Sequence, residues 1–335
     1  MIEIDGSYLE GGGQILRTAV SLSAVTGQPC KIFNIRKGRP NPGLKAQHLN
    51  AIETVARLCN GKLKGNKIGS TTIEFYPGEI TGGKFSVDIG TAGSITLLLQ
   101  TIIPPAIYTK KEIEIEIRGG TNVMWSPSID YFRHVFCNFL DRMGVYVKID
   151  VQKRGFYPRG GGVVRFREVP GQRLKKLSIT ERGKFKRIDI WSVCSKDLKG
   201  RRVAERQIEG FKKVLSYTEH EHSLYTDTLS TGSCIHAHAH FENTKLGADF
   251  IGSPGMPAED VGMECAKILK DEMNSGATLD RWMGDQIIPY MALAGGGEFS
   301  ASEITNHAKT NMWVTEKFLP VKFEVNGNII SCKKM

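Results

Sequence analysis

One order of secondary-structure elements recurs along this sequence, and it constrains the fold more than any single motif. Some segments alternate apolar and polar residues, which is typical of strands, and others repeat apolar residues at the longer period typical of helices. These segments follow one another in the order strand, helix, strand, helix, strand, strand. This order covers residues 1–80 and again residues 81–168. It begins a third time at residues 169–180, breaks off, and resumes over residues 280–335. We therefore predict an α+β fold in which three repeated βαβαββ units form one large domain, with helices on one side of three small sheets.

The interruption of the third unit predicts a second, smaller domain. Residues 181–279 are flanked by glycine and polar residues, and they carry their own helical and strand-like patterns. The expected elements are helices at 203–216 and 259–274 and strands at 233–242 and 245–251. We therefore expect a smaller α/β domain inserted into the third repeat.

The charge of the chain favours an anionic partner such as nucleic acid or a nucleotide. Its 45 Lys and Arg against 35 Asp and Glu give a formal net charge of +10. Thirteen of these cations and only three carboxylates lie in residues 148–187. That segment is either a solvated face or a positive stripe at the domain junction that steers a nucleic-acid backbone.

Cysteine use and hydropathy bear on the compartment. The seven cysteines are scattered without a C-x-x-C pair, which predicts a reducing compartment and argues against a zinc ribbon. The acidic, strand-like N-terminus does not resemble a signal peptide. The uncharged stretch 89–109 contains Gln100 and Pro104-Pro105, so we expect a buried helix ending at the prolines rather than a membrane span. We expect no membrane partner and a cytoplasmic location, or a nuclear one in a eukaryotic cell; a homodimer is left open.

Two segments near the N-terminus suit anion binding. The loop Glu10-Gly-Gly-Gly-Gln14 precedes a predicted helix, where backbone N–H groups can approach an anion. The turn with Arg36 and Arg39 precedes a helix that carries Gln47 and His48, and paired guanidinium groups suit phosphate oxygens, although structural salt bridges fit either arginine equally well. The chain has no P-loop, no dinucleotide fingerprint and no Lys-x-Asp-Gly motif, so a nucleotide would need another scaffold.

Two further motifs contain histidine. His307 lies in a Thr-Asn-His-x-x-Thr-Asn corner that opens a predicted helix, where an imidazole can act as a neutral nucleophile toward phosphate or simply cap the helix. His236, His238 and His240 alternate on one predicted strand and therefore share a face. No carboxylate or cysteine stands at a telling spacing from them, so a row facing solvent or another domain is favoured over a metal cluster.

Taken together, these motifs resemble the RNA 3′-terminal phosphate cyclases over essentially the whole chain, as does the predicted triple repeat with one inserted domain. The resemblance rests on Asp5-Gly6, Glu10-Gly-Gly-Gly-Gln-Ile-Leu-Arg17, Ile35-Arg36-Lys-Gly-Arg39-Pro40, Pro42-Gly43-Leu44, Gln47-His48, Gly93-Ser94, Leu99-Gln100-Thr101, Gly155-Phe-Tyr-Pro158, Gly160-Gly-Gly162, Asp285-Gln286 and Asn306-His307.

The resemblance implies an ATP-dependent reaction in three steps. A histidine takes AMP from ATP, the AMP passes to an RNA 3′-terminal phosphate, and the neighbouring 2′-hydroxyl then expels AMP to leave a 2′,3′-cyclic phosphate. The implied partners are ATP, RNA with a 3′-terminal phosphate, and a divalent metal, Mg or Mn. His307 would be the nucleophile and Glu10 would hold or adjoin the metal.

The resemblance also implies two groups of binding residues. The ATP or RNA phosphates would meet Arg17, Arg36, Arg39, Gln47 and His48, and the nucleotide pocket would be lined by Gln100, Pro127, Trp282, Asp285 and Gln286. Trp282, which stands where some members have tyrosine, and Pro127 are flat enough to enclose a purine ring, although both also suit a core or groove wall.

Two other functions compete with this interpretation. A cyclase-like factor of ribosome biogenesis would bind RNA without adenylylation, and we would expect it to lack the nucleophilic histidine. An enolpyruvyl transferase would need neither that histidine nor a basic stripe. The presence of His307 therefore favours the enzyme.

Overall fold

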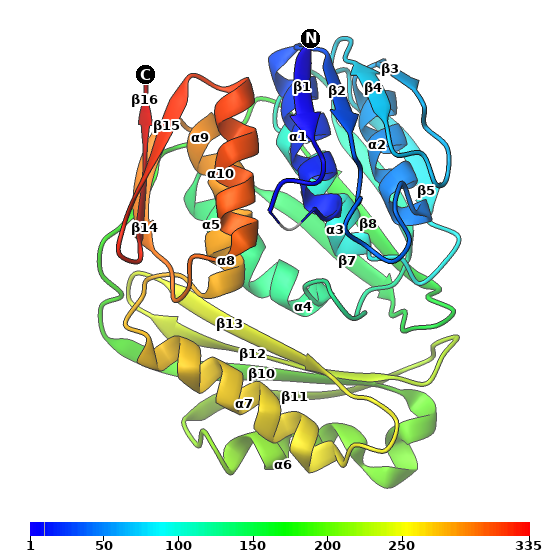
Figure 1. The fold of residues 1–335 in the computed structure, drawn as a ribbon. Helices are drawn as coiled ribbons and strands as arrows, with labels where there is room; N and C mark the ends of the chain where they lie inside the picture. Colours follow the sequence, from blue (N-terminus) through cyan, green and yellow to red (C-terminus); the bar gives the residue numbers. More distant parts are fainter. Residues whose placement is uncertain (10) are drawn as a thin grey trace.

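The computed structural model describes residues 1–9 and 11–335. The chain is a mixture of helices and four small sheets, each with four strands. Three of the sheets and the helices between them make up the upper part of the molecule in Figure 1, and the fourth sheet with two helices lies below them.

The first sheet has the strand order β1-β2-β4-β3 and is covered by two helices. Its first two strands are parallel and its remaining pairs are antiparallel. The elements are β1 (Ile2–Asp5), α1 (Gly13–Thr26), β2 (Cys30–Phe33), α2 (Ala46–Leu58), β3 (Lys62–Lys64) and β4 (Ile73–Tyr76).

The second sheet, β5-β6-β8-β7, and the third, β9-β14-β16-β15, have the same pattern of one parallel and two antiparallel pairs. The second unit contains β5 (Gly83–Asp88), α3 (Ile95–Ala106), β6 (Ile113–Gly119), α4 (Ile129–Tyr131), η1 (Phe132–Phe136), α5 (Cys137–Arg142), β7 (Val147–Lys153) and β8 (Gly162–Glu168). The third contains β9 (Leu177–Ile179), α8 (Arg281–Gln286), α9 (Ile288–Leu293), β14 (Gly296–Ser300), α10 (Asn306–Phe318), β15 (Val321–Asn326) and β16 (Ile329–Lys334).

The helices of these three sheets pack against one another and share one hydrophobic core. Buried side chains from all three units belong to the same cluster, among them Leu16, Phe132 and Phe299. α1 contacts both α3 and α10, and Figure 1 shows α1 and α10 running side by side. Apolar burial thus fixes the positions of helices that lie far apart in the sequence.

The fourth sheet has a hydrophobic core of its own. Its order is β11-β10-β12-β13, and two helices cover it, with Phe211 and Leu269 buried in the separate cluster. The elements are β10 (Phe185–Ser195), η2 (Lys196–Arg201), α6 (Val203–Lys212), β11 (Thr218–Thr226), β12 (Ser233–Phe241), β13 (Lys245–Ile251) and α7 (Ala258–Asn274). β10 and β11 were not predicted from the sequence; most of β11 is an exposed, polar edge strand without an apolar face.

Two helical stretches of the large core are interrupted. The stretch from Ile129 to Arg142 contains the π-helical turn η1, and the stretch from Arg281 to Leu293 is divided into α8 and α9. The division falls at Ile287, just before Pro289, which has no backbone N–H for the helical ladder. α3, which we expected to end at Pro104-Pro105, contains both prolines and ends one residue after them, at Ala106.

A side chain from a neighbouring helix explains this continuation. A proline at position 105 leaves the carbonyl of Thr101 without its helical donor. The Ser21 hydroxyl on α1 donates to that carbonyl instead.

Among the described residues, no helix is long and apolar enough to cross a membrane.

The contact between α6 and α7 depends on glycine and gives a test of the fold. A Cβ on Gly262 would lie 1.8 Å from the carbonyl oxygen of Gln207, so we expect Gly262→Ala to push the helices apart. Overpacking of this kind costs about 1–3 kcal/mol of unfolding free energy, measurable by urea denaturation. Gly200→Ala is the matched control because a Cβ there meets nothing within 4 Å. Equal stability of the two variants would contradict the packing described here.

Candidate functional site

His307 is the second residue of α10, and side chains fix where that helix begins. The hydroxyl of Thr305 accepts a hydrogen bond from the Ala308 backbone N–H at 3.0 Å, which caps the helix. The same hydroxyl donates to Oδ1 of Asp285 at 2.5 Å. His307 therefore stands at a helix N-terminus that is tied to α8, where backbone N–H groups favour an anion.

Gln14, at the start of α1, orients the His307 ring. Its side-chain N–H donates to the His307 carbonyl oxygen at 3.3 Å, and its Oε1 lies against Nδ1 of the His307 ring. An amide oxygen can only accept, so Nδ1 carries the hydrogen and the lone pair of the neutral ring is on Nε2. The contact thus leaves Nε2 as the ring nitrogen that could act as a nucleophile.

Gln14 was not among the predicted site residues, although it belongs to the glycine-loop motif. The two partners are 293 residues apart, so no local pattern connects them. The one signal in the sequence was its place directly before an apolar helix and after three glycines.

A second set of contacts joins α10 to α1 and to α8. The Thr18 hydroxyl donates to Oδ1 of Asn311 at 2.7 Å, and Nδ2 of Asn311 donates to the carbonyl oxygen of Asp285 at 2.8 Å. Burial raises the pKa of Asp285 to about 8, with Asp280 and Glu303 acting in the same direction. Asp285 thus lies behind the start of α10 as a buried support for it.

His48 and two of the predicted arginines gather around the glycine loop. A Cβ on Gly13 would lie 2.2 Å from Nε2 of His48 and 3.2 Å from Nη1 of Arg17. A Cβ on Gly12 would lie 3.5 Å from Nη2 of Arg39. The absence of side chains on these glycines therefore lets the backbone at the start of α1 approach the three groups closely.

His48 presents a neutral hydrogen-bond donor at this point. Its Nδ1 accepts from the backbone N–H of Lys45 at 3.2 Å, so the ring hydrogen is on Nε2, which faces Gly13. Burial, followed by the positive charges of Arg17, Arg36 and Lys45, lowers the pKa of His48 to about 3. The ring therefore stays neutral at physiological pH and can donate to a phosphate oxygen.

The arginines differ in their surroundings. Burial lowers the pKa of Arg17 to about 10, which still leaves it charged at neutral pH. Nη1 of Arg36 donates to the carbonyl oxygens of Asn41 and Gly43 at 2.7 and 3.0 Å. Arg36 thus holds its own turn together, and contact of this arginine with a phosphate stays a prediction.

Two of the predicted nucleotide-pocket residues line a small cavity between α1, α3 and α8. Nε2 of Gln100 donates to Oε1 of Gln286 at 2.7 Å. Both side chains line a cavity of about 50 Å³ that also includes Gln14 and Arg17. The cavity therefore joins part of the predicted nucleotide pocket to the residue that orients His307.

The remaining predicted residues lie around this region with different contacts. Oε1 of Gln47 accepts from the Ser94 backbone N–H at 3.3 Å, and the Pro127 carbonyl accepts from the Thr96 hydroxyl at 2.8 Å. Trp282 packs edge-on against Tyr131, with ring centroids 6.3 Å apart. Stacking of a purine between Pro127 and Trp282 stays a prediction, and the predicted metal ligand Glu10 lies outside the described residues.

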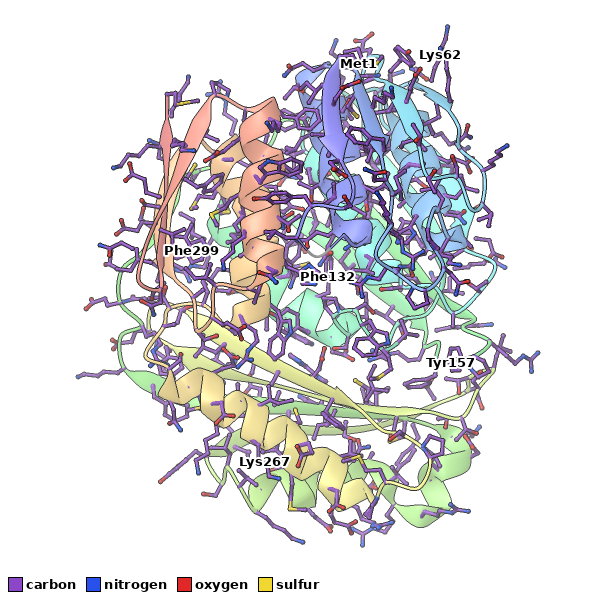
Figure 2. All side chains as sticks on the ribbon, in the orientation of Figure 1. Met1, Lys62, Phe132, Tyr157, Lys267 and Phe299 are labelled. Carbon is purple, nitrogen blue, oxygen red and sulfur yellow. The ribbon has the colours of Figure 1, made fainter. Side chains whose placement is uncertain are left out.

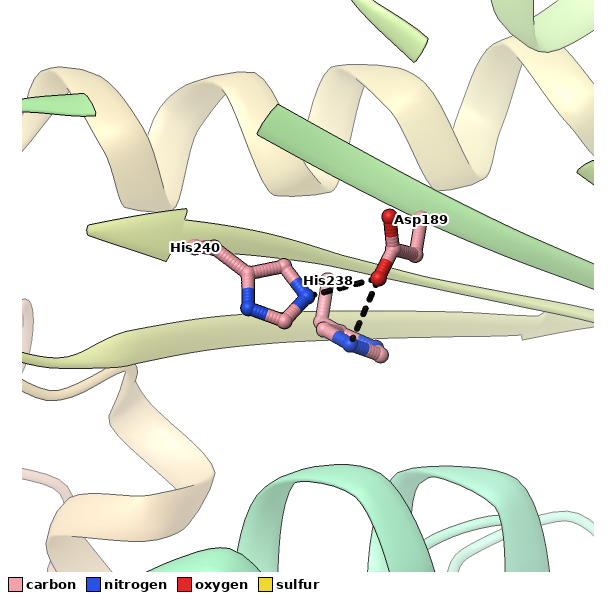
Figure 3. A group of neighbouring side chains, drawn as sticks. All are labelled: Asp189, His238 and His240. Atoms are coloured by element: carbon pink, nitrogen blue, oxygen red, sulfur yellow. Dashed lines mark hydrogen bonds and ion pairs between the residues drawn. The ribbon is translucent and has the colours of Figure 1, made fainter. Parts of the chain in front are cut away.

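The histidine row faces the helices of the large core rather than solvent. His238 is opposite Asp189 of β10, and Oδ2 of Asp189 lies 2.7 Å from Nε2 of His240 and 3.8 Å from Nε2 of His238 (Figure 3). His134 of η1 stacks on Trp191 of β10 at 4.2 Å between ring centroids. The sequence spacing could not reveal this carboxylate, because it comes from a neighbouring strand.

Among the described residues, Asp189, His238 and His240 form the one cluster with the geometry of a metal site. Its surroundings oppose a divalent cation. Nε of Arg187 lies 3.0 Å from Oδ1 of Asp189, and the carboxylate of Asp189 also interacts with the charge of Lys245. The carboxylate is already neutralised by cations, so we describe the cluster as a hydrogen-bonded contact between the two parts of the chain.

The contact between Gln14 and His307 predicts a measurable tautomer. Above the pH at which the ring titrates, we expect His307 to carry its hydrogen on Nδ1 in the wild type. Gln14→Ala removes the acceptor, worth about 0.5–1.5 kcal/mol, and should shift the ring toward the Nε2–H tautomer several-fold, as read from ¹⁵N shifts of labelled histidine. Gln28→Ala is the control, because Gln28 joins the same two helices through the Phe318 carbonyl without touching the ring. A wild-type ring with its hydrogen on Nε2 would contradict the assignment.

Comparison with known proteins identifies the family. The family model described as RNA 3′-terminal phosphate cyclase matches residues 8–325. A protein of that name from Methanococcoides burtonii is 49% identical over 328 residues, 97% of this chain and 96% of the relative. Proteins of that name from Methanopyrus kandleri and Pyrococcus furiosus are 46% and 44% identical, each over 98% of this chain and 96% of the relative. The resemblance seen in the sequence is thereby confirmed, and the chain belongs to the RNA 3′-terminal phosphate cyclase family.

Proposed function

We propose that this protein is an ATP-dependent ligase that converts an RNA 3′-terminal phosphate to a 2′,3′-cyclic phosphate through a covalent histidine–AMP intermediate. Membership of the family supports the overall reaction. The observation that carries the mechanism is the contact between Gln14 and Nδ1 of His307 at the N-terminus of α10. In the neutral ring, this contact leaves the lone pair on the other nitrogen, which is the form a nucleophile needs.

In the first step, Nε2 of His307 attacks the α-phosphorus of ATP. The new N–P bond forms as the bond to the bridging oxygen breaks, and pyrophosphate leaves with that electron pair. The ring gains positive charge in this step, and the carbonyl of Gln14 stabilises it through the Nδ1 hydrogen. The α10 N-terminus, Arg17 and the Nε2–H of His48 are suited to the negative charge on the phosphates.

In the second step, an oxygen of the RNA 3′-phosphate attacks the phosphorus of the histidine-bound AMP. The N–P bond breaks and its electron pair returns to Nε2, so the ring is neutral again. In the third step, the terminal 2′-hydroxyl attacks the 3′-phosphorus, loses its proton and expels AMP. Because the hydroxyl is already beside the activated phosphorus, proximity supplies much of the rate.

The nucleotide would be held by the remaining predicted residues. Gln100 and Gln286 offer amide groups, Arg36, Arg39 and Gln47 would contact the phosphates, and Pro127 and Trp282 would enclose the base. A divalent ion, Mg or Mn, suits a carboxylate ligand such as Glu10. That residue lies outside the described ones, so no step above depends on the metal.

We also infer the domain organisation from the matching topology of three sheets. The units at about 1–80, 81–168 and 169–180 plus 280–335 would be copies of one βαβαββ unit, and residues 181–279 would be an inserted domain. Their shared strand pairing and the two separate hydrophobic cores support this division. The cytoplasmic location and a homodimer stay predictions.

Covalent labelling tests the mechanism. Incubation with magnesium and α-labelled ATP, without RNA, should transfer acid-labile label to the wild type and reduce it at least about 10³-fold in His307→Ala, because no other group replaces the nucleophile. His220→Ala is the matched control, since this histidine on β11 is exposed and lies 3.7 Å from the carboxylate of Glu219, its neighbour in the chain. Label retained by His307→Ala would refute the assignment of the nucleophile. A folded wild type that binds ATP without being labelled would favour the cyclase-like binding factor instead.

A further inference from the structure

A second cavity lies away from the pocket around Gln14 and Gln100. It has a volume of about 510 Å³, within the range of sites that hold a nucleotide-sized ligand. Its walls come from the ends of β5 and β6, from the segment between β7 and β8, and from residues 227–229 of the inserted segment. Figure 2 shows Tyr157, on the segment between β7 and β8, at the side of the molecule where these parts meet.

The charges in the cavity favour an anion. Four cations line it, Arg118, Lys153, Arg154 and Arg159, against two carboxylates, Asp88 and Asp227. Arg154 is buried and bound bidentately by Asp130 at 2.6 and 2.7 Å, so its charge is already compensated. Arg118 is paired with Glu116 at 3.0 Å.

Two cations are left to act on a ligand. Lys153 and Arg159 are exposed, and no described carboxylate forms an ion pair with either within 4 Å. One of the two carboxylates is weakened as a competitor, because Asp227 pairs with Lys196 at 3.5 Å. The other, Asp88, accepts from the Gly90 backbone N–H at 2.8 Å. Lys153 and Arg159 thus give the cavity a net attraction for phosphate groups.

The cavity is connected to the candidate site through one loop. Thr91 lines the cavity, and three residues later the Ser94 backbone N–H donates to Gln47. Gln47 precedes His48, whose ring faces the glycine loop at Gly13. The loop between β5 and α3 therefore lines the cavity at Thr91 and contacts the helix of Gln47 and His48 at Ser94.

An aromatic side chain stands next to these cations. Tyr157 is 75% exposed, two residues before Arg159 on the same turn. The turn is held against the inserted segment, because the backbone N–H of Arg159 donates to the Ser230 hydroxyl at 3.1 Å. Exposed aromatic rings beside Lys and Arg are typical of surfaces on which single-stranded nucleic acids stack their bases.

We propose that this cavity binds the nucleotides that precede the terminal one in the RNA substrate, with Lys153 and Arg159 on backbone phosphates and Tyr157 stacked on a base. The inference rests on the proposed function and extends it, because it assigns a single-stranded RNA track outside the ATP site. The inserted segment contributes one wall of that track, through residues 227–229.

The test separates RNA binding from the ATP step. Lys153→Glu/Arg159→Glu should be adenylylated by ATP at the wild-type rate, whereas its KM for an RNA of about 12 nucleotides with a 3′-phosphate should rise at least about tenfold, with kcat unchanged. Loss of two phosphate contacts should also reduce the slope of log KM against log salt by about 1.4. Tyr157→Ala should raise KM about fivefold or more, with the salt dependence unchanged.

A second charge-reversal pair controls for net charge. Lys62→Glu/Lys111→Glu changes the net charge by the same amount, and both residues are exposed. Lys111 precedes β6, whereas Arg118, which lines the cavity, lies near the other end of that strand. This control should keep the wild-type KM. The RNA track would be overturned by any of three results. These are an unchanged KM in Lys153→Glu/Arg159→Glu, an equal rise of KM in the control, or a loss of adenylylation in Lys153→Glu/Arg159→Glu. If the wild type itself takes no label from ATP, the proposed function fails. Direct binding of the same RNA to the wild type and to Lys153→Glu/Arg159→Glu, measured by fluorescence anisotropy, then decides separately whether the cavity binds RNA.

Discussion

The structure depends most on the pairing of α1 with α10, two helices from opposite ends of the chain. Gln14 contacts the His307 ring and backbone at one end of the pair, Thr18 donates to Asn311 in the middle, and Gln28 donates to the Phe318 carbonyl at the other end. The buried apolar faces of the two helices join the same core. One packing interaction therefore both stabilises the fold and orients the ring of His307, the proposed nucleophile.

Burial also sets the protonation of the groups around the candidate site. It lowers the pKa of His48 and raises that of Asp285, so both are held in their neutral forms. A neutral imidazole donor near the glycine loop and a neutral support behind α10 leave the positive charge there to the arginines, Lys45 and the helix N-terminus. Such an arrangement favours a polyphosphate.

The sequence predicted what depends on local pattern and could not predict what depends on tertiary contact. The order of strands and helices follows from apolar periodicity, and His307 follows from its motif, because both are short-range signals. Gln14 as the partner of His307 and Asp189 as the partner of His240 come from distant elements and leave no spacing to read. β11 was missed because most of its residues are exposed at a sheet edge. The continuation of α3 through two prolines depends on Ser21, which lies on another helix.

The site of AMP attachment on the His307 ring tests the central claim most directly. The protein labelled with ¹⁵N-histidine would be adenylylated with ATP, and the ¹⁵N–³¹P coupling would identify the ring nitrogen bonded to phosphorus. Because Gln14 holds the hydrogen on Nδ1, the account predicts that phosphorus is bonded to Nε2. Attachment to Nδ1 would contradict it, since that nitrogen could not then donate to Gln14 and the packing of α1 on α10 would not select the nucleophile.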